Sequence, residues 1–258
     1  MLELWGGFDA LTTDLRSGTA RTLLDHWVSV KQEGRPGICL EGRRYLRLSD
    51  VVIVTELSEQ GSRALLDRYV RREIASRGLI LQCSLCGATA FYHLEEVGPG
   101  FKCWRCRRAN ELTRIAWKGP AEEPAFFYAL DEVAYLGISN DIHVPILALA
   151  EVAKGSRSFL HMPEVEVHQP GRKNIEIDIW AIVDGRIVVG EAKKDDKLER
   201  NEETERKRCD ALKGVLSALT ADVFVVASAG PQWSQRTRKV VEDRLSGTIS
   251  IRWLNNVL

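Results

Sequence analysis

The chain has 258 residues, of which 45% are hydrophobic, and 36 Lys and Arg residues balance 36 Asp and Glu residues. This composition excludes a disordered polymer and supplies enough apolar surface for one large folded domain or two modest ones. The neutral total removes any argument for nucleic-acid binding from overall charge, so charge has to be counted by segment.

No stretch of the chain approaches the ~20 consecutive apolar residues of a membrane helix, and the first residues lack a basic segment followed by an apolar run. We therefore expect a cytoplasmic protein that does not cross a membrane. Of the 6 cysteines, Cys39 and Cys209 stand alone and are interpreted as reduced thiols, whereas the others form two tight pairs.

Residues 1–80 are expected to form a mainly helical or winged-helix-like region. Its clearest element follows Gly61, where Ser62 can cap a helix that Gly78 would end. The outer face of this helix carries several arginines, which fit either a solvated face or a surface that follows phosphates.

The next segment, residues 81–118, contains the pattern C-x2-C-x16-C-x2-C, formed by Cys83, Cys86, Cys103 and Cys106. Four thiolates at this spacing predict a closed tetrahedral site for structural Zn2+. The pattern resembles a zinc ribbon. His93 lies between the pairs, but four cysteines already complete the coordination shell, so we expect it to be a surface or packing residue.

Around the second cysteine pair, the sequence places cations beside an aromatic residue. The aromatic residue is Trp104, and the cations are Lys102, Arg105, Arg107 and Arg108. A cationic surface with a ring available for stacking suits nucleic acid. Protein docking and a purely structural insert are equally consistent with the residues.

A glycine and two prolines within residues 119–124 predict a seam before a third region, residues 119–258. Helices are expected near 126–137 and 145–154, followed by two strands, the turn Asp184-Gly185 and a third strand. A charged helix over about 199–219, a strand and a helix near 232–245 follow. Strand, helix and strand in this order predict a parallel crossover, and hence a mixed α/β sheet flanked by helices.

Charge differs sharply between the regions. Residues 62–118 hold eleven Lys or Arg and five Asp or Glu, a net of +6, whereas residues 119–206 hold ten and eighteen, a net of −8. A basic region beside an acidic one is consistent with a nucleic-acid-binding surface next to a metal-binding site. Ordinary variation of surface charge would also produce it.

The turn Asp184-Gly185 between two β-rich runs predicts a two-residue hairpin, since both residues tolerate positive φ. If Val183 faces Arg186, the same register brings Asp178 opposite Glu191. Two carboxylates facing each other in an apolar sheet require neutralisation. A divalent cation supplies it most simply, and a raised carboxyl pKa or a local salt bridge from a lysine are the alternatives.

Asp178, twelve intervening residues and then Glu191-Ala192-Lys193 resemble the motif of the PD-(D/E)xK nuclease superfamily, over roughly residues 125 to 245. The resemblance implies a restriction-endonuclease-like fold and Mg2+- or Mn2+-dependent hydrolysis of DNA phosphodiesters. A zinc ribbon ahead of such a domain is similar to arrangements in bacterial restriction and phage-defence proteins. The proline that gives the motif its first letter is absent, because Ile177 precedes Asp178.

The resemblance implies that Asp178 and Glu191 ligate the catalytic metal, with the carbonyl of Ala192 as a candidate third ligand. Lys193 would orient the attacking water or help to deprotonate it, and would stabilise charge that develops on the phosphate.

The family often adds an acid from the preceding helix. Glu151 is our candidate for this position, with Glu132 and Glu176 as further candidates.

The sequence thus favours a metal-dependent DNA endonuclease. The rival interpretation is a catalytically inactive zinc-ribbon subunit that binds nucleic acid or acts as a scaffold. RNA as the substrate, a protein partner and a homo-oligomer all stay open.

Overall fold

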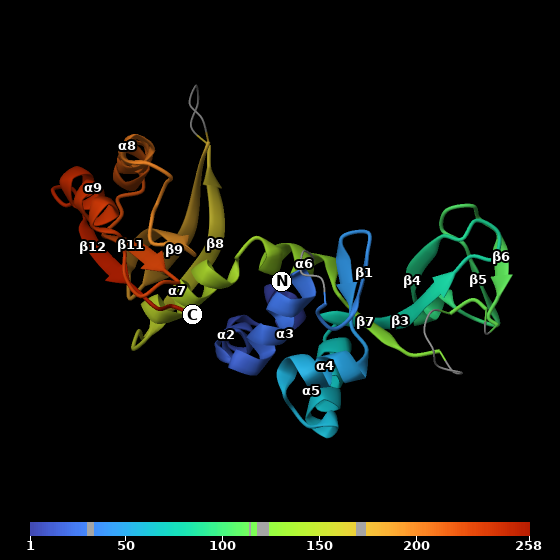
Figure 1. Cartoon of the computed structure of the whole chain (residues 1–258). Helices are drawn as coiled ribbons and strands as arrows, with labels where there is room; N and C mark the ends of the chain where they lie inside the picture. The colour runs from blue at the N-terminus through green and yellow to red at the C-terminus, as the bar shows by residue number, and fades with distance from the viewer. Residues whose placement is uncertain (30–33, 114, 118–123, 169–173) are drawn as a thin grey trace. The chain divides into compact units, whose positions relative to one another are not determined.

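The computed structural model describes residues 1–29, 34–113, 115–117, 124–168 and 174–258. The chain divides into two compact units, Met1–Asn140 and Asp141–Leu258, which follow one another along the colour gradient of Figure 1. Both combine helices with small sheets, so the chain is a mixed α/β protein. The predicted seam falls almost entirely on residues 119–123, which lie outside the described part.

The first unit begins with helices and continues through short strands. Its helical elements are α1 (Leu2–Trp5), α2 (Phe8–Arg16), α3 (Gly18–Val28), α4 (Leu48–Thr55), α5 (Glu59–Arg71), the 3-10 helix η1 (Leu94–Glu96) and α6 (Glu132–Ser139). Its strands are β1 (Ile38–Leu40), β2 (Arg43–Tyr45), β3 (Ala75–Gln82), β4 (Thr89–His93), β5 (Gly100–Lys102), β6 (Ala109–Glu111) and β7 (Phe127–Leu130).

The N-terminal helices surround an aromatic core. Trp5, Trp27 and Tyr69 are fully buried there. The buried carboxylate of Asp14 accepts a hydrogen bond from Trp5 Nε1 at 3.1 Å and pairs with Arg68 at 2.8 Å. Arg68 therefore serves the core of this region, which weakens the interpretation of the α5 arginines as a phosphate-binding row.

Helix α5 differs from the prediction at both ends. It begins earlier, because Ser58 rather than Ser62 caps it by accepting a hydrogen bond from Gly61 N at 3.1 Å. It also ends before Gly78, which lies inside β3. A Cβ at Gly78 would lie 2.1 Å from the carbonyl oxygen of Tyr92, so this glycine allows close approach of two strands and does not end the helix.

The boundary between the units is also later than the sequence suggested. Residues 127–130 form β7 rather than the start of a helix, and β7 pairs antiparallel with β3. Tyr128 exchanges backbone hydrogen bonds with Leu46 at 3.1 and 2.7 Å. Because these contacts hold β7 and α6 in the first unit, the second unit begins at Asp141 and not near residue 119.

The cysteine-rich segment consists of two hairpins. Strands β3 and β4 pair antiparallel over Gly78 to Gln82, and β5 pairs with β6 over Gly100 to Lys102. Its small core comprises Leu79, Leu81, Tyr92, Phe101 and Ala116. A core of this size provides little hydrophobic stabilisation, so a metal staple would account for much of the stability of the segment.

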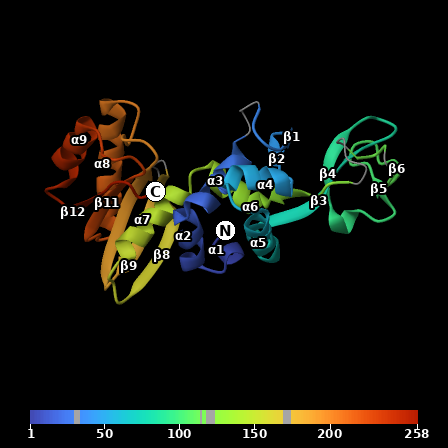
Figure 2. The ribbon, with the colours of Figure 1, turned by 60° about the horizontal axis from the view of Figure 1, so that its bottom comes forward.

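The second unit is built on a five-stranded sheet of order β12-β11-β10-β9-β8. Its elements are α7 (His143–Ala153), β8 (Phe159–Val167), β9 (Ile175–Val183), β10 (Arg186–Lys193), α8 (Glu202–Ala218), β11 (Val223–Ser228), α9 (Gln235–Leu245) and β12 (Ser250–Leu254). Strands β10, β11 and β12 run parallel, and β8 and β9 are antiparallel to their neighbours. Helix α7 packs on one face, and α8 and α9 on the other (Figure 2).

The β9–β10 hairpin has the predicted register. Asp184 and Gly185 form its turn with φ of 47° and 80°. The ladder starts at Val183 opposite Arg186 and continues to Ile179 opposite Gly190. The parallel crossover from β10 through α8 to β11 is confirmed as well.

Among the described residues, we find no single helix with the length and apolar character to span a membrane. The bent pair of α6 and α7 reaches that length only when the two helices are taken together.

Candidate functional site

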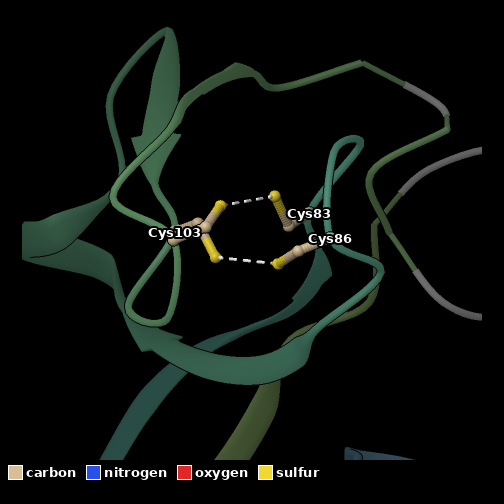
Figure 3. Close-up of side chains that lie close together, drawn as sticks. Cys83, Cys86 and Cys103 are labelled. Carbon is tan, nitrogen blue, oxygen red and sulfur yellow. Dashed lines mark hydrogen bonds between the residues drawn. The ribbon is translucent and has the colours of Figure 1, made fainter.

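The four cysteines form a compact sulfur cluster at the tips of the two hairpins. All four Sγ atoms lie within 4.8 Å of one another. The distance is 3.6 Å between Cys83 and Cys106 and 3.7 Å between Cys86 and Cys103, and Figure 3 shows the sulfurs converging. A disulfide would need about 2.05 Å, whereas a tetrahedral site with Zn–S bonds of about 2.3 Å has edges of about 3.8 Å. The cluster therefore fits zinc.

The two cysteine pairs adopt the same local structure. Cys83 N donates to the carbonyl of Ala88 and Gly87 N donates to the carbonyl of Cys83. The second pair repeats this arrangement through Cys103, Arg107 and Arg108. The residue after each pair has positive φ, 69° at Gly87 and 62° at Arg107, which closes the turn around the metal position.

These tight turns also aim backbone N–H groups at the sulfurs. Hydrogen bonds from the backbone of Cys86 are the main cause that lowers the pKa of Cys83 to about 6. The backbone of Cys106 lowers the pKa of Cys103 in the same way. Both effects favour the thiolate, which is the form that binds metal. His93 lies outside the cluster and packs edge-on against Phe91 at 5.1 Å.

The cationic surface predicted beside the second cysteine pair is exposed. Trp104 is 45% exposed, and Leu85 at the tip of the first pair is 65% exposed. The four predicted cations, Lys102, Arg105, Arg107 and Arg108, are all exposed as well. Exposed cations around a ring form a surface that attracts phosphate and can stack a base.

In the second unit, three predicted residues converge where β9 and β10 separate. Lys193 Nζ lies 2.7 Å from Asp178 Oδ2 and 3.0 Å from Glu191 Oε2. Glu191 is 0% exposed and Asp178 is 8% exposed. The ammonium group therefore bridges two buried carboxylates, which is the position that a shared metal cation would need.

The strands separate at the acids themselves. The ladder stops at Ile179 opposite Gly190, one step before Asp178 and Glu191 would pair. Instead, Ala192 N donates to Asp178 Oδ2 at 2.8 Å. The Asp178 side chain thus accepts the hydrogen bond that a backbone carbonyl would accept in a continued ladder. Its carboxylate is therefore turned toward β10, the strand that carries Glu191.

Burial dominates the electrostatics of this cluster. It is the main cause that raises the pKa of Glu191, and the Lys193 ammonium opposes it. Burial would lower the pKa of Lys193, but the carboxylates of Glu191 and Asp178 outweigh it and raise that pKa. A buried carboxylate of this kind needs cations close by to stay ionised.

Sequence reasoning missed Arg208, which reaches the site from α8. Its guanidinium pairs with Glu191 Oε1 and also donates to the backbone carbonyl of Glu176. The sequence predicted a charged helix here without linking any of its residues to Glu191, and surface pairs such as Lys207 with Glu203 at 2.7 Å lie on its exposed face. No spacing rule links residue 208 to residue 191, because the contact exists only through helix packing.

Sequence reasoning also missed Glu164 of the edge strand β8. The β8–β9 ladder contains the pairs on both sides of Glu164 and Asp178, so these two acids lie opposite each other. Glu164 has a φ of 55°, which is a strained conformation for a residue within a strand. Burial, and then the charges of Glu176 and Asp178, raise its pKa.

The structure does not bring the predicted helix acid Glu151 to this cluster. Its carboxylate pairs with Lys154 at 2.6 Å, and its carbonyl accepts a hydrogen bond from Arg252 of β12. Helix α7 runs so that its first end lies near the end of β10, where Asp141 pairs with Lys194 at 2.9 Å. Glu151 belongs to the opposite end of the helix, so the structure does not place the predicted additional acid beside Asp178 and Glu191.

The two alternatives to Glu151 lie elsewhere. Glu132 belongs to the first unit and pairs there with Arg43. Glu176 faces Glu166 across β8 and β9, and its side chain is exposed. Neither takes the position that Glu164 occupies opposite Asp178.

The carboxylate cluster fits a hard cation in one further respect. Within the described part of the chain, the buried Oε2 atom of Glu191 accepts no hydrogen bond, although Lys193 Nζ is 3.0 Å away. Such an atom has unused capacity to ligate. Among the described residues, however, the cysteine cluster is the only group of three or more candidate ligands that is already drawn together. A metal at the carboxylates would take the place of the Lys193 ammonium, which lies 2.7 and 3.0 Å from them.

Comparison with known proteins adds little to this picture. No protein-family model and no curated protein matches the chain. Among solved structures, it is similar to protein VC1899 from Vibrio cholerae, with a TM-score of 0.36 and 14% sequence identity. The alignment covers 99% of this chain and 51% of that one, so the chain spans about half the length of VC1899.

Proposed function

We propose that the second unit is a metal-dependent nuclease domain with a restriction-endonuclease-like fold, and that it hydrolyses phosphodiester bonds of DNA. The observation that carries the proposal is the Lys193 ammonium held 2.7 and 3.0 Å from two buried carboxylates. The order of elements supports it, since an antiparallel hairpin bears the acids and a helical crossover leads to a parallel strand.

Asp178 and Glu191 would hold Mg2+ or Mn2+, with the Ala192 carbonyl as the further ligand that the resemblance implies. When bound, the metal would polarise the phosphate and lower the pKa of a water molecule. Lys193, displaced from between the acids, would then lie beside the scissile phosphate. There its ammonium would stabilise negative charge that develops on the phosphate and orient the attacking water.

Glu164 is the residue that we propose in place of Glu151 as the additional acid. It lies opposite Asp178 on the neighbouring strand; its side chain is exposed, but partial burial of the carboxyl group, followed by the charges of Glu176 and Asp178, raises its pKa. A carboxylate there could ligate through water or orient the nucleophile. Metal sites commonly depend on such supporting groups.

We also propose that the zinc ribbon holds DNA. The exposed Trp104 ring and the surrounding cations suit a flexible strand, because every base has a face that can stack and every phosphate attracts cations. An inactive zinc-ribbon subunit that binds nucleic acid or acts as a scaffold is the second candidate, and the separate cationic surface is the observation that favours it.

Cleavage of plasmid and linear DNA by the zinc-loaded protein tests the proposal. We expect cutting with Mg2+ or Mn2+, none with EDTA, and none with Asp178→Ala or Lys193→Ala. Glu203→Gln, on the exposed surface of α8, is the matched control and should cut normally. DNA retention without cutting in any metal would favour the inactive subunit, and cutting of RNA alone would replace the substrate class.

A further inference from the structure

Arg208, the second cation beside Glu191, has no part in the catalytic chemistry proposed above. Arg208 lies in the first half of α8 and approaches the carboxylate from the side opposite to Lys193. Lys193 takes Oε2 of Glu191, whereas Arg208 takes Oε1. The two cations therefore divide the two oxygens of one fully buried carboxylate between them.

The two cations differ in what else holds them. Among the described residues, the Lys193 ammonium pairs with the two acids that would ligate the metal, so metal binding would release it from both at once. Arg208 also donates to the carbonyl of Glu176 on β9, a backbone atom that metal binding does not change. Both contacts come from Nη2 of Arg208, whose two N–H groups lie in the fixed plane of the guanidinium, whereas an ammonium rotates freely on a flexible stem.

We propose that Arg208 is a positioning residue that holds Oε1 of Glu191 and so keeps Oε2 turned toward the metal site. This inference rests on the proposed function, because it assigns Glu191 to a catalytic metal. Without the guanidinium, the Glu191 carboxylate can rotate and Lys193 becomes its main counter-ion, so the metal must compete with a more tightly held ammonium. Groups that orient a ligand in this way commonly change metal affinity by about 10- to 100-fold.

Simple electrostatics predicts the opposite result, which makes the inference testable. Removal of a positive charge beside a cation site should raise affinity for the cation, whichever residue carries the charge. If Arg208 positions the ligand, its removal lowers affinity, whereas removal of the competing Lys193 does not. The two cations on one carboxylate should therefore behave differently.

The experiment measures Mn2+ binding to zinc-loaded protein by the electron paramagnetic resonance signal of free Mn2+, with Asp178→Asn as the blank for the site. We expect the dissociation constant to rise about tenfold or more in Arg208→Met, and to stay the same or fall in Lys193→Met. Arg206→Met is the control, because Arg206 lies on the same helix but pairs with Glu202 at 2.6 Å. It should bind Mn2+ as the wild-type protein does.

Arg208→Lys keeps the positive charge and provides a second variant in case Arg208→Met fails to fold. We expect Arg208→Lys to bind Mn2+ more weakly than the wild-type protein but more tightly than Arg208→Met. Arg208 variants that bind Mn2+ as tightly as wild type, or more tightly, would overturn the inference. So would equal weakening in Arg208→Met and Lys193→Met. Wild-type protein that shows no Asp178-dependent Mn2+ binding would instead refute the proposed nuclease, so the two failures are distinct.

Discussion

The cysteine cluster, which fits zinc, and the carboxylate cluster, which we propose as a site for Mg2+ or Mn2+, are built in different ways. The cysteines lie at the tips of two similar turns, and their sulfurs already stand at tetrahedral distances of 3.6 and 3.7 Å. The acids lie on neighbouring strands, where an ammonium and a guanidinium occupy them. The cysteine sulfurs already have the spacing that zinc requires, whereas a metal at the acids would have to replace a side-chain cation.

The difference agrees with the roles that we propose for the two metals. Four soft thiolates leave no open position on zinc, so that site can stabilise the ribbon but cannot bind a substrate. Hard oxygen ligands around Mg2+ leave room for water and phosphate. If the acids bind a metal as proposed, Lys193 and Arg208 would keep the buried carboxylates neutralised whenever the metal is absent.

Among the substitutions that test the difference between the two clusters, removal of one cysteine sulfur should have the largest effect. We expect Cys103→Ser to lose zinc and to unfold the ribbon, because metal binding supplies on the order of 10 kcal/mol to the folding of such segments. Zinc content by elemental analysis and hydrogen exchange in β5 and β6 measure the loss. Cys39→Ser, outside the cluster, should keep its zinc, and full zinc occupancy in Cys103→Ser would contradict the assignment.

The resident cation of the carboxylate site gives the next largest effect. Lys193→Met should lower the free energy of unfolding by about 3 kcal/mol in the absence of divalent metal, because it leaves buried acids without their ammonium. Mg2+ should restore part of that loss, as a replacement cation would. Urea unfolding with and without Mg2+ measures both, with Lys207→Met as the surface control. A loss that Mg2+ does not reduce would argue against a metal at these acids.

Glu164 and Glu151 allow the acid that the structure places opposite Asp178 to be compared with the acid that the sequence pattern favoured. We expect Glu164→Gln to slow DNA cleavage about tenfold, because it lies opposite Asp178. Glu151→Gln should change the rate less than about twofold, since its partner is Lys154. Initial rates at saturating Mg2+ measure both variants, and the reverse order would restore Glu151 as the additional acid.

The smallest effect is expected at the ribbon surface. Trp104→Ala should weaken binding of single-stranded DNA by about 1 kcal/mol, roughly fivefold, because it removes one stacking platform. Fluorescence anisotropy measures the affinity, and zinc content should stay unchanged. The cleavage rate at saturating DNA should also be preserved; unchanged affinity would point to protein docking or a structural role for the ribbon.

Several parts of this picture could be predicted because they depend on neighbours in the chain. The pair Asp184-Gly185 determines a tight turn, and the turn determines the register that leads to Asp178 and Glu191. The spacing of the two cysteine pairs likewise predicts that the four sulfurs form one cluster. Prediction failed where an interaction crosses elements, as for β7, whose residues 127–130 look helical but pair with β3.

The paired cysteine turns and the acidic hairpin could be predicted from local sequence, because short loops leave few conformations to choose from. Which further groups meet them depends on how distant elements pack. The direction of α7 removes Glu151 from the acids, the packing of α8 brings Arg208 to Glu191, and the edge strand β8 sets Glu164 opposite Asp178. Such contacts join residues far apart in the chain, and no local spacing encodes them.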